Sequence, residues 1–110
     1  MKNTLVVDRA RWAHGEGPAS RLYRSSDKTF CILGTYLHQC GVPLRLLRDK
    51  EDPLVISHPK VPYWARMAEN VATLMYLNDL PRARESLRER RLAMIFHRFG
   101  VCVKFVGRPA

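Results

Sequence analysis

The sequence predicts a small α+β domain, in which terminal strands form a sheet of two to three strands packed with about three helices. Two observations support this fold class. Short β-branched apolar runs lie near both ends of the chain, and three stretches with helical apolar periodicity lie between them. At 110 residues the chain suits one hydrophobic core, so residues 1–110 are expected to form a single domain.

The two terminal runs are the expected strands. Thr4–Asp8 is short and rich in β-branched residues, which favours an extended backbone. Val101–Val106 carries the clearest strand pattern in the sequence. Since both segments are short, we expect them to share one small sheet.

Residues 9–28 are expected to form a long basic loop. The apolar periodicity stops there, and glycine, proline and serine are frequent. Loops of this length in a compact domain are usually functional or disordered. Trp12, Leu22 and Tyr23 would anchor the segment to the core, so an ordered loop is favoured.

The first helix is predicted over Thr29–Cys40, with Asp27 as its N-cap and Gly41 as its end. A strand through residues 29–33 is the alternative. A further helical turn is expected within Leu44–Lys50, and a short strand over Leu54–Ser57.

Two amphipathic helices are expected in the second half of the chain. Apolar residues recur at helical spacing over Tyr63–Leu77. Asp79 is expected to cap the last helix, with Pro81 near its first turn and Gly100 at its end. The buried stripe of that helix is expected to contain Leu92, Ile95, Phe96 and Phe99.

The charge balance indicates an acidic partner. Nineteen Lys and Arg residues stand against ten Asp and Glu residues, which gives a net charge of +9, and 14 of the 19 cations are arginine. Guanidinium groups pair bidentately with phosphate or carboxylate, and a basic surface attracts polyanions in a salt-dependent way. The alternative is a cation-rich surface that only keeps the protein in solution.

The last helix carries the first candidate site. Arg84, Arg91 and Arg98 are seven residues apart, so they drift by only about 20° per step and form a row suited to a phosphate backbone. Arg88 lies between this row and the apolar stripe. The alternative is that the arginine stems cover the edge of the core while their charged heads remain solvated. Glu85 and Glu89 could also neutralise part of the charge through i,i+3 pairs.

The long loop carries the second candidate site. Arginines interleaved with aromatic residues can pair with phosphates and stack on bases. The alternative is that the aromatic residues hold the loop against the core. The candidate residues are Arg9, Arg11, Arg21 and Arg24, with Trp12 and Tyr23 as the stacking residues.

Catalytic and cofactor signatures are weak. Cys31 lies near a predicted helix start, where the helix dipole would lower its pKa, and it is the fallback catalytic residue. The four histidines lack metal-site spacing, so no metal and no cofactor are expected. The cysteines read as reduced thiols, and no apolar stretch suits a signal peptide or a membrane span, so we expect a cytoplasmic protein without membrane contact.

Short pieces over nearly the whole chain resemble a family of small uncharacterised proteins of bacteriophages and prophages. Members of that family often have two adjacent cysteines where this chain has Cys31 and Ile32. The resemblance implies a phage accessory protein in a bacterial host, with no known activity. The pieces that carry it are Val6–Arg9 with Trp12, Gly15–Gly17, Leu22–Arg24, Asp27 with Cys31–Gly34, Leu77–Asp79, Arg88–Glu89, Phe96, Gly100 and Val103–Val106.

The sequence therefore favours a non-enzymatic accessory protein that binds nucleic acid or a nucleoprotein. Host takeover or anti-defence activity, including CRISPR inhibition, suits its size and its resemblance. The alternatives are a binder of an acidic host protein surface, an enzyme that uses Cys31, and a small-nucleotide binder built on residues 15–17.

Overall fold

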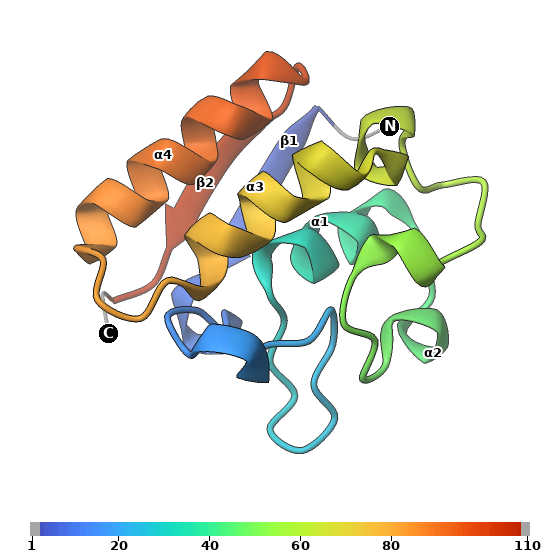
Figure 1. Ribbon diagram of the computed structural model, residues 1–110, viewed down its shortest axis with the longest axis horizontal. Helices are drawn as coiled ribbons and strands as arrows, with labels where there is room; N and C mark the ends of the chain where they lie inside the picture. Colours follow the sequence, from blue (N-terminus) through green and yellow to red (C-terminus); the bar gives the residue numbers. More distant parts are fainter. Residues whose placement is uncertain (1–2, 109–110) are drawn as a thin grey trace.

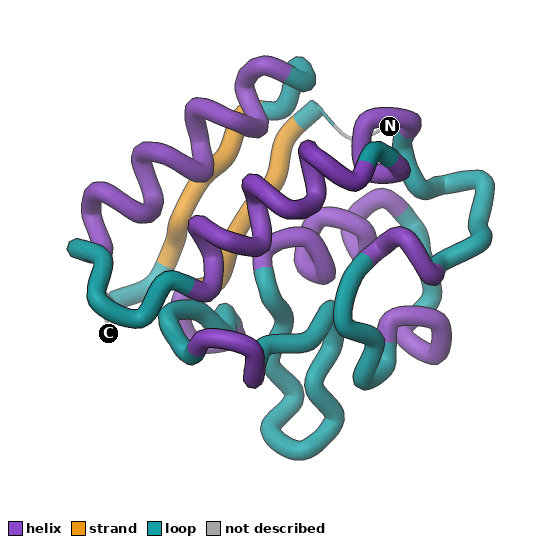
Figure 2. The backbone as a smooth tube through the Cα atoms, in the orientation of Figure 1, coloured by secondary structure: helices purple, strands orange, loops and turns teal. Residues whose placement is uncertain are grey.

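The computed structural model describes residues 3–108. Strands β1 (Thr4–Asp8) and β2 (Cys102–Val106) pair in parallel, with Thr4 opposite Cys102 and Asp8 opposite Val106. The described residues form one two-stranded sheet, seen as neighbouring strands in Figure 2. The predicted α+β class and the pairing of the terminal strands are confirmed.

Three main helices and one helical turn complete the described structure. They are α1 (Ile32–Cys40), α2 (Leu44–Leu47), α3 (Ala68–Asp79) and α4 (Glu85–Arg98). Helix α4 packs on β2 and α3, α3 packs on α1, and α1 packs on β1. Figure 1 shows α3 and α4 running side by side in front of the strands. Short 3-10 turns lie at Arg9–Arg11, Gly17–Ala19, Pro53–Val55 and Tyr63–Arg66.

The core lies between the helices and the inner face of β1. Leu5 and Val7 are fully buried because alternate residues of a strand point to the same face. An aromatic cluster joins three helical segments: Tyr36 of α1 and Phe96 of α4 both contact Trp64, with ring centroids 5.4 and 5.6 Å apart. This cluster fixes α4 against the rest of the domain.

The long basic loop is held by buried contacts, as expected. Trp12 and Leu22 are buried, and Tyr23 is half-buried. The backbone passes very close to α1, since a Cβ built on Gly34 would lie 1.7 Å from the Leu22 carbonyl oxygen. Only glycine fits there, and the contact holds the second half of the loop against the helix.

The predicted start of the first helix is wrong. Helix α1 begins at Ile32, and its N-cap is Cys31, whose Sγ accepts a hydrogen bond from the Gly34 amide at 3.4 Å. Asp27 is not the cap because its carboxylate accepts from the amide and hydroxyl of Thr29. Thr29 and Phe30 are extended and form isolated bridges with Arg24 and Trp12 respectively, so the strand alternative was partly right.

Two further predictions in the middle of the chain are corrected. Residues 54–57 form no strand, since Pro53–Val55 is a 3-10 turn in which the Asp52 carboxylate accepts from the Leu54 amide. The helix predicted over Tyr63–Leu77 is divided. A 3-10 turn follows Pro62, Met67 is extended, and α3 starts at Ala68. The predicted helical turn within residues 44–50 is confirmed as α2.

The predicted start of the last helix is also wrong. Asp79 is the last residue of α3, and its carboxylate accepts from Ser20 and from the side-chain amide of Asn78. Pro81 lies in the connection, and α4 starts at Glu85. The C-terminal end is as expected, with Gly100 at a positive φ of 79° just after the helix.

Candidate nucleic-acid interface

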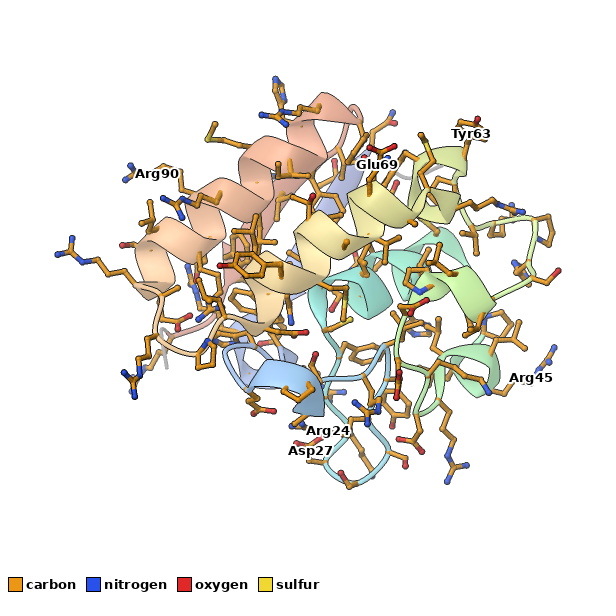
Figure 3. All side chains as sticks on the ribbon, viewed as in Figure 1. Arg24, Asp27, Arg45, Tyr63, Glu69 and Arg90 are labelled. Atoms are coloured by element: carbon orange, nitrogen blue, oxygen red, sulfur yellow. The ribbon has the colours of Figure 1, made fainter. Side chains whose placement is uncertain are left out.

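The predicted arginine row lies on the solvent side of α4. Arg84, Arg91 and Arg98 are all exposed. Arg90 is exposed as well, and Figure 3 shows it projecting away from the helix into solvent. Across the described part of the chain, none of these four guanidinium groups makes a hydrogen bond or ion pair. We call Arg84, Arg90, Arg91 and Arg98 the α4 arginine face.

Arg88 does not belong to this face, and its assignment as a ligand contact is wrong. Its side chain is 1% exposed. Nη1 donates to the carbonyl oxygens of Leu77 and Asn78 at 2.7 and 3.0 Å, and Nη2 donates to that of Leu80 at 2.6 Å. These carbonyls lie at the C-terminal end of α3, where the helix dipole also makes a positive charge favourable. Arg88 therefore holds α3 against α4.

Both glutamates of α4 form ion pairs on the side of the helix that faces the rest of the protein. Glu89 accepts two hydrogen bonds from Arg9, at 2.8 and 2.7 Å. Glu85 lies 2.8 Å from His14 and 3.4 Å from Arg88, which is one of the i,i+3 pairs expected from the sequence. Since both carboxylates are paired away from the outer face, they leave its arginines unneutralised.

Most of the loop arginines are engaged inside the protein. Besides Glu89, Arg9 donates to the Gly107 carbonyl at 2.7 Å. Arg24 is paired with both Glu16 and Asp27 at 2.6 Å, and Figure 3 shows Arg24 and Asp27 together on the loop. The hydrogen bonds from Asp27 and Glu16 raise the pKa of Arg24 above its usual range. For these side chains the expectation of free phosphate ligands is wrong.

Arg21 and Trp12 are also engaged inside the protein. Arg21 donates to the carbonyls of Pro18 and Ser20 at 2.7 and 2.8 Å. Trp12 is buried, donates from Nε1 to Asn78 Oδ1 at 2.8 Å, and stacks on His14. A base cannot reach its ring, so the alternative that Trp12 pins the loop to the core is the correct one.

Arg11 and Tyr23 are the loop candidates that remain accessible. The Arg11 side chain is exposed, and within residues 3–108 its guanidinium has no partner. Tyr23 is half-buried and lines a pocket of about 280 Å³ together with Arg11, Lys28, Phe30 and His38. Sequence reasoning missed the last three residues, because it placed Phe30 inside a helix and treated the tip of the loop as a connection.

The two basic regions stay apart. Figure 3 shows Arg90 on the outer side of α4 and Arg24 in the loop well away from it. Of the four candidate loop arginines, all among the described residues, Arg9 alone pairs with α4, and its charge is used by Glu89. The molecule thus presents an open α4 face and a separate pocket beside Tyr23.

Gly15, the first glycine of residues 15–17, serves packing. Gly15 has a φ of 70°, and a Cβ there would lie 3.1 Å from Arg88 Nη2. Its amide donates to the Asn78 carbonyl at 2.8 Å. The backbone is used to accommodate Arg88, so the suggested nucleotide loop has no geometric support.

Cys31 is in an unfavourable place for a nucleophile. It is fully buried, and burial raises the pKa of its thiol to about 12. The expectation that the helix start would lower this pKa is wrong, because desolvation of the thiolate outweighs the hydrogen bond from Gly34.

Residues 3–108 contain neither a candidate metal cluster nor a helix suited to crossing a membrane. No group of three or more His, Cys, Asp or Glu side chains in that range could hold a metal ion. In the same range, no helix is both long and apolar enough to cross a membrane.

Comparison with protein-family models, with curated proteins and with solved structures finds no match to this chain.

Proposed function

We propose that this protein binds nucleic acid, alone or in a nucleoprotein, through the α4 arginine face. One observation carries the proposal: four exposed arginines lack partners in the described structure, while both glutamates of the same helix are paired on its inner side. Such a face gains affinity by neutralising phosphates and releasing their counterions.

The spacing of the row suits a phosphate backbone. Residues seven apart on a helix are separated by about 10.5 Å along its axis, at 1.5 Å per residue. Phosphates on one strand of a duplex rise by about 3.4 Å each. Arg84, Arg91 and Arg98 are therefore far enough apart to meet different phosphates.

The face is suited to shape and charge more than to base sequence. Between the arginines the exposed residues of α4 are Ser86, Met94 and His97. Without Asn or Gln side chains to read adenine, we expect mainly contacts with the backbone, and base readout limited to guanine, with which arginine pairs bidentately.

The biological setting is part of the same proposal. A small non-enzymatic protein that covers nucleic acid would suit a phage accessory role, such as host takeover or the inhibition of a CRISPR complex. The support for this setting is the family resemblance together with the basic face.

The test compares two charge-matched double variants, R91Q/R98Q and K50Q/K60Q. Binding to labelled duplex DNA, duplex RNA and single strands is measured by fluorescence anisotropy between 50 and 200 mM salt. Two lost phosphate contacts should lower the slope of log affinity against log salt by about 1.8, at 0.9 per phosphate on a duplex. The K50Q/K60Q slope should stay near that of the wild type. No binding, or equal losses in both variants, would refute the proposal.

An acidic protein partner is the second candidate, and one groove favours it. A hollow of about 500 Å³ lies between α4 and β2, with Met94, Val101 and Val103 as apolar lining and Arg90 and Arg98 as cations. Among the described residues, β2 has a strand partner on one edge only. An extended acidic segment could pair there by strand addition.

A short peptide tests this second candidate. An alternating valine–glutamate decapeptide should shift the amide NMR signals of Val101 and Val103, and a valine–lysine decapeptide should not. Unchanged signals with the glutamate peptide would remove this candidate.

A further inference from the structure

We propose that the pocket beside Tyr23 binds a single nucleotide unit, with its base against the aromatic wall and its phosphate at the cationic rim. We call it the Tyr23 pocket; it is lined by Val6, Asp8, Arg11, Tyr23, Lys28, Phe30, Thr35, His38, Gln39 and Leu44. It shares no residue with the α4 arginine face, so the inference does not rest on the proposed function.

The size of the pocket fits one nucleotide. Its volume of about 280 Å³ lies near the lower end of small-molecule sites, which start at about 300 Å³. A dinucleotide cofactor would need more room. The pocket opens at the outer side of β1. There the Gln39 side chain accepts a hydrogen bond from the Val6 amide and donates one to the Val6 carbonyl oxygen. These bonds fix that wall before any ligand arrives.

Three aromatic rings form a continuous wall. Phe30 lies in the middle, with its ring centroid 4.8 Å from that of Tyr23 and 5.6 Å from that of His38. Phe30 and Tyr23 are half-buried, and His38 is exposed. Flat rings that are fixed by neighbours and open to solvent on one side are the surfaces on which nucleobases stack.

The His38 ring has a defined orientation at this wall. Its Nδ1 lies 3.3 Å from the carbonyl oxygen of Val42, which can only accept a hydrogen bond. With the proton on Nδ1, Nε2 can accept a hydrogen bond from an exocyclic amino group or a ring N–H of a base.

Cations at the rim supply the phosphate contacts. Arg11 and Lys28 are exposed, and in the described structure neither charged group has a partner. The one carboxylate in the lining, Asp8, accepts from the Ala10 amide at 3.0 Å. Next to the pocket, a second hollow shares Tyr23, Lys28 and Leu44 and adds Arg45 and Arg48. The positive charge thus continues along the path that a neighbouring phosphate would take.

Lys28 occupies an unusual backbone conformation for its type. Its φ is 61°, in the left-handed region that favours glycine, and its amide donates to the Arg24 carbonyl at 2.8 Å. Pairing of Arg24 with Asp27 holds the turn in place. A lysine is thus held where the backbone alone would favour glycine, which suits a side chain with a role at the rim.

The positive φ of Lys28 allows a variant that removes the charge without disturbing the turn. K28G removes the ammonium group and places the favoured residue at the positive φ, so the turn should remain folded. K28Q keeps the stem and removes the charge, and K60Q is its charge-matched control outside the pocket. F30L keeps an apolar side chain of similar volume but removes the stacking surface.

The experiment titrates the full chain with the four ribonucleoside 5′-monophosphates, followed by calorimetry. Nucleosides and inorganic phosphate test each half of the ligand, and a single-stranded hexanucleotide separates a free nucleotide from a unit of a strand. We expect monophosphates to bind more tightly than either half, and K28G, K28Q and R11Q each to weaken binding about tenfold, as loss of a bond to a charged group does. F30L should weaken nucleotides but not phosphate, and K60Q should match the wild type.

Three results would overturn the inference: no binding of monophosphate or hexanucleotide at millimolar concentration, phosphate binding as tightly as the nucleotides, or wild-type affinity in both Lys28 variants. Tighter binding of the hexanucleotide identifies a strand as the source, and equal binding identifies a free nucleotide. Since R91Q/R98Q leaves the pocket intact, it should retain monophosphate binding even if the α4 proposal fails.

Discussion

Arg9 and Glu89 lie 80 residues apart in the chain and form a two-pronged ion pair, with Nε 2.8 Å from Oε2 and Nη2 2.7 Å from Oε1. The remaining nitrogen, Nη1, donates to the Gly107 carbonyl at 2.7 Å. One guanidinium therefore joins the end of β1, the helix α4 and the residue after β2. The pair also removes a carboxylate from the surroundings of the α4 arginine face.

Replacement of Glu89 by Gln should lower the thermal midpoint of unfolding and strengthen polyanion binding. The amide can accept only part of the bidentate contact, and the net charge of the protein rises by one. Circular dichroism melts at low and high salt measure the first effect, which should shrink as salt screens the lost pair. E51Q removes an exposed carboxylate without a partner in the described structure, and its midpoint should stay unchanged. Equal midpoints for E89Q and E51Q would contradict the role of the pair.

Replacement of Arg88 by Met should be far more damaging than the same change at Arg91. Loss of Arg88 leaves the carbonyl oxygens of Leu77 and Leu80 without this donor and removes one of the two cationic partners of Glu85, which should cost about 3–5 kcal/mol. That is a large part of the about 5–15 kcal/mol that stabilises a domain. R91M should stay within about 0.5 kcal/mol of the wild type. Urea unfolding of both variants measures this difference in the free energy of unfolding. Similar midpoints would show that Arg88 is not a structural residue.

Local patterns predicted the elements whose structure depends on their own residues. β1 has the expected bounds, β2 differs by one residue, and the Leu92 and Phe96 stripe of α4 is fully buried. Gly100 ends the helix through its own backbone conformation. The predicted cap at Asp79 failed because the distant Ser20 donates to its carboxylate, and the one at Asp27 failed because the neighbouring Thr29 does.

The same contrast between local and distant determinants applies to the charged residues. A spacing of seven places Arg91 and Arg98 on one flank of α4 whatever surrounds it, and Arg84 stands just before the helix as its extended N-cap. The fate of Arg9, by contrast, depends on a glutamate 80 positions away, which no local pattern contains. The Tyr23 pocket was missed for a related reason: Phe30 and His38 meet only because α1 begins two residues after Phe30 and not before it.

Cys31 should be the least reactive of the three thiols in the folded protein. Burial raises its pKa to about 12, so almost no thiolate exists at neutral pH, and the side chain is closed to reagents. Brief alkylation with iodoacetamide at pH 7.5, read by mass spectrometry, should modify the exposed Cys102 first. Labelling of Cys31 before Cys102 would restore the alternative of a cysteine nucleophile.

Asp27 should make the loop sensitive to acid. Hydrogen bonds from Arg24 and Thr29 hold the pKa of its carboxyl well below the usual range. A carboxyl whose pKa is lowered on folding stabilises the protein above its unfolded pKa of about 3.9, and this contribution is lost as the pH falls toward the folded value. D27N should therefore melt below the wild type at pH 7, and the gap should narrow as the pH drops below about 4.

The measurement is a series of melts from pH 2 to pH 7, with E51Q as the control. Amide hydrogen exchange at Thr29 reports on the turn itself, because that amide donates to Asp27. Exchange there should be faster in D27N than in the wild type at pH 7, since the carboxylate that orders the turn is gone. A gap between the D27N and wild-type midpoints that stays constant down to pH 2 would mean that the Arg24–Asp27 pair does not titrate with folding, and that the stability difference does not come from the charge of the Asp27 carboxylate.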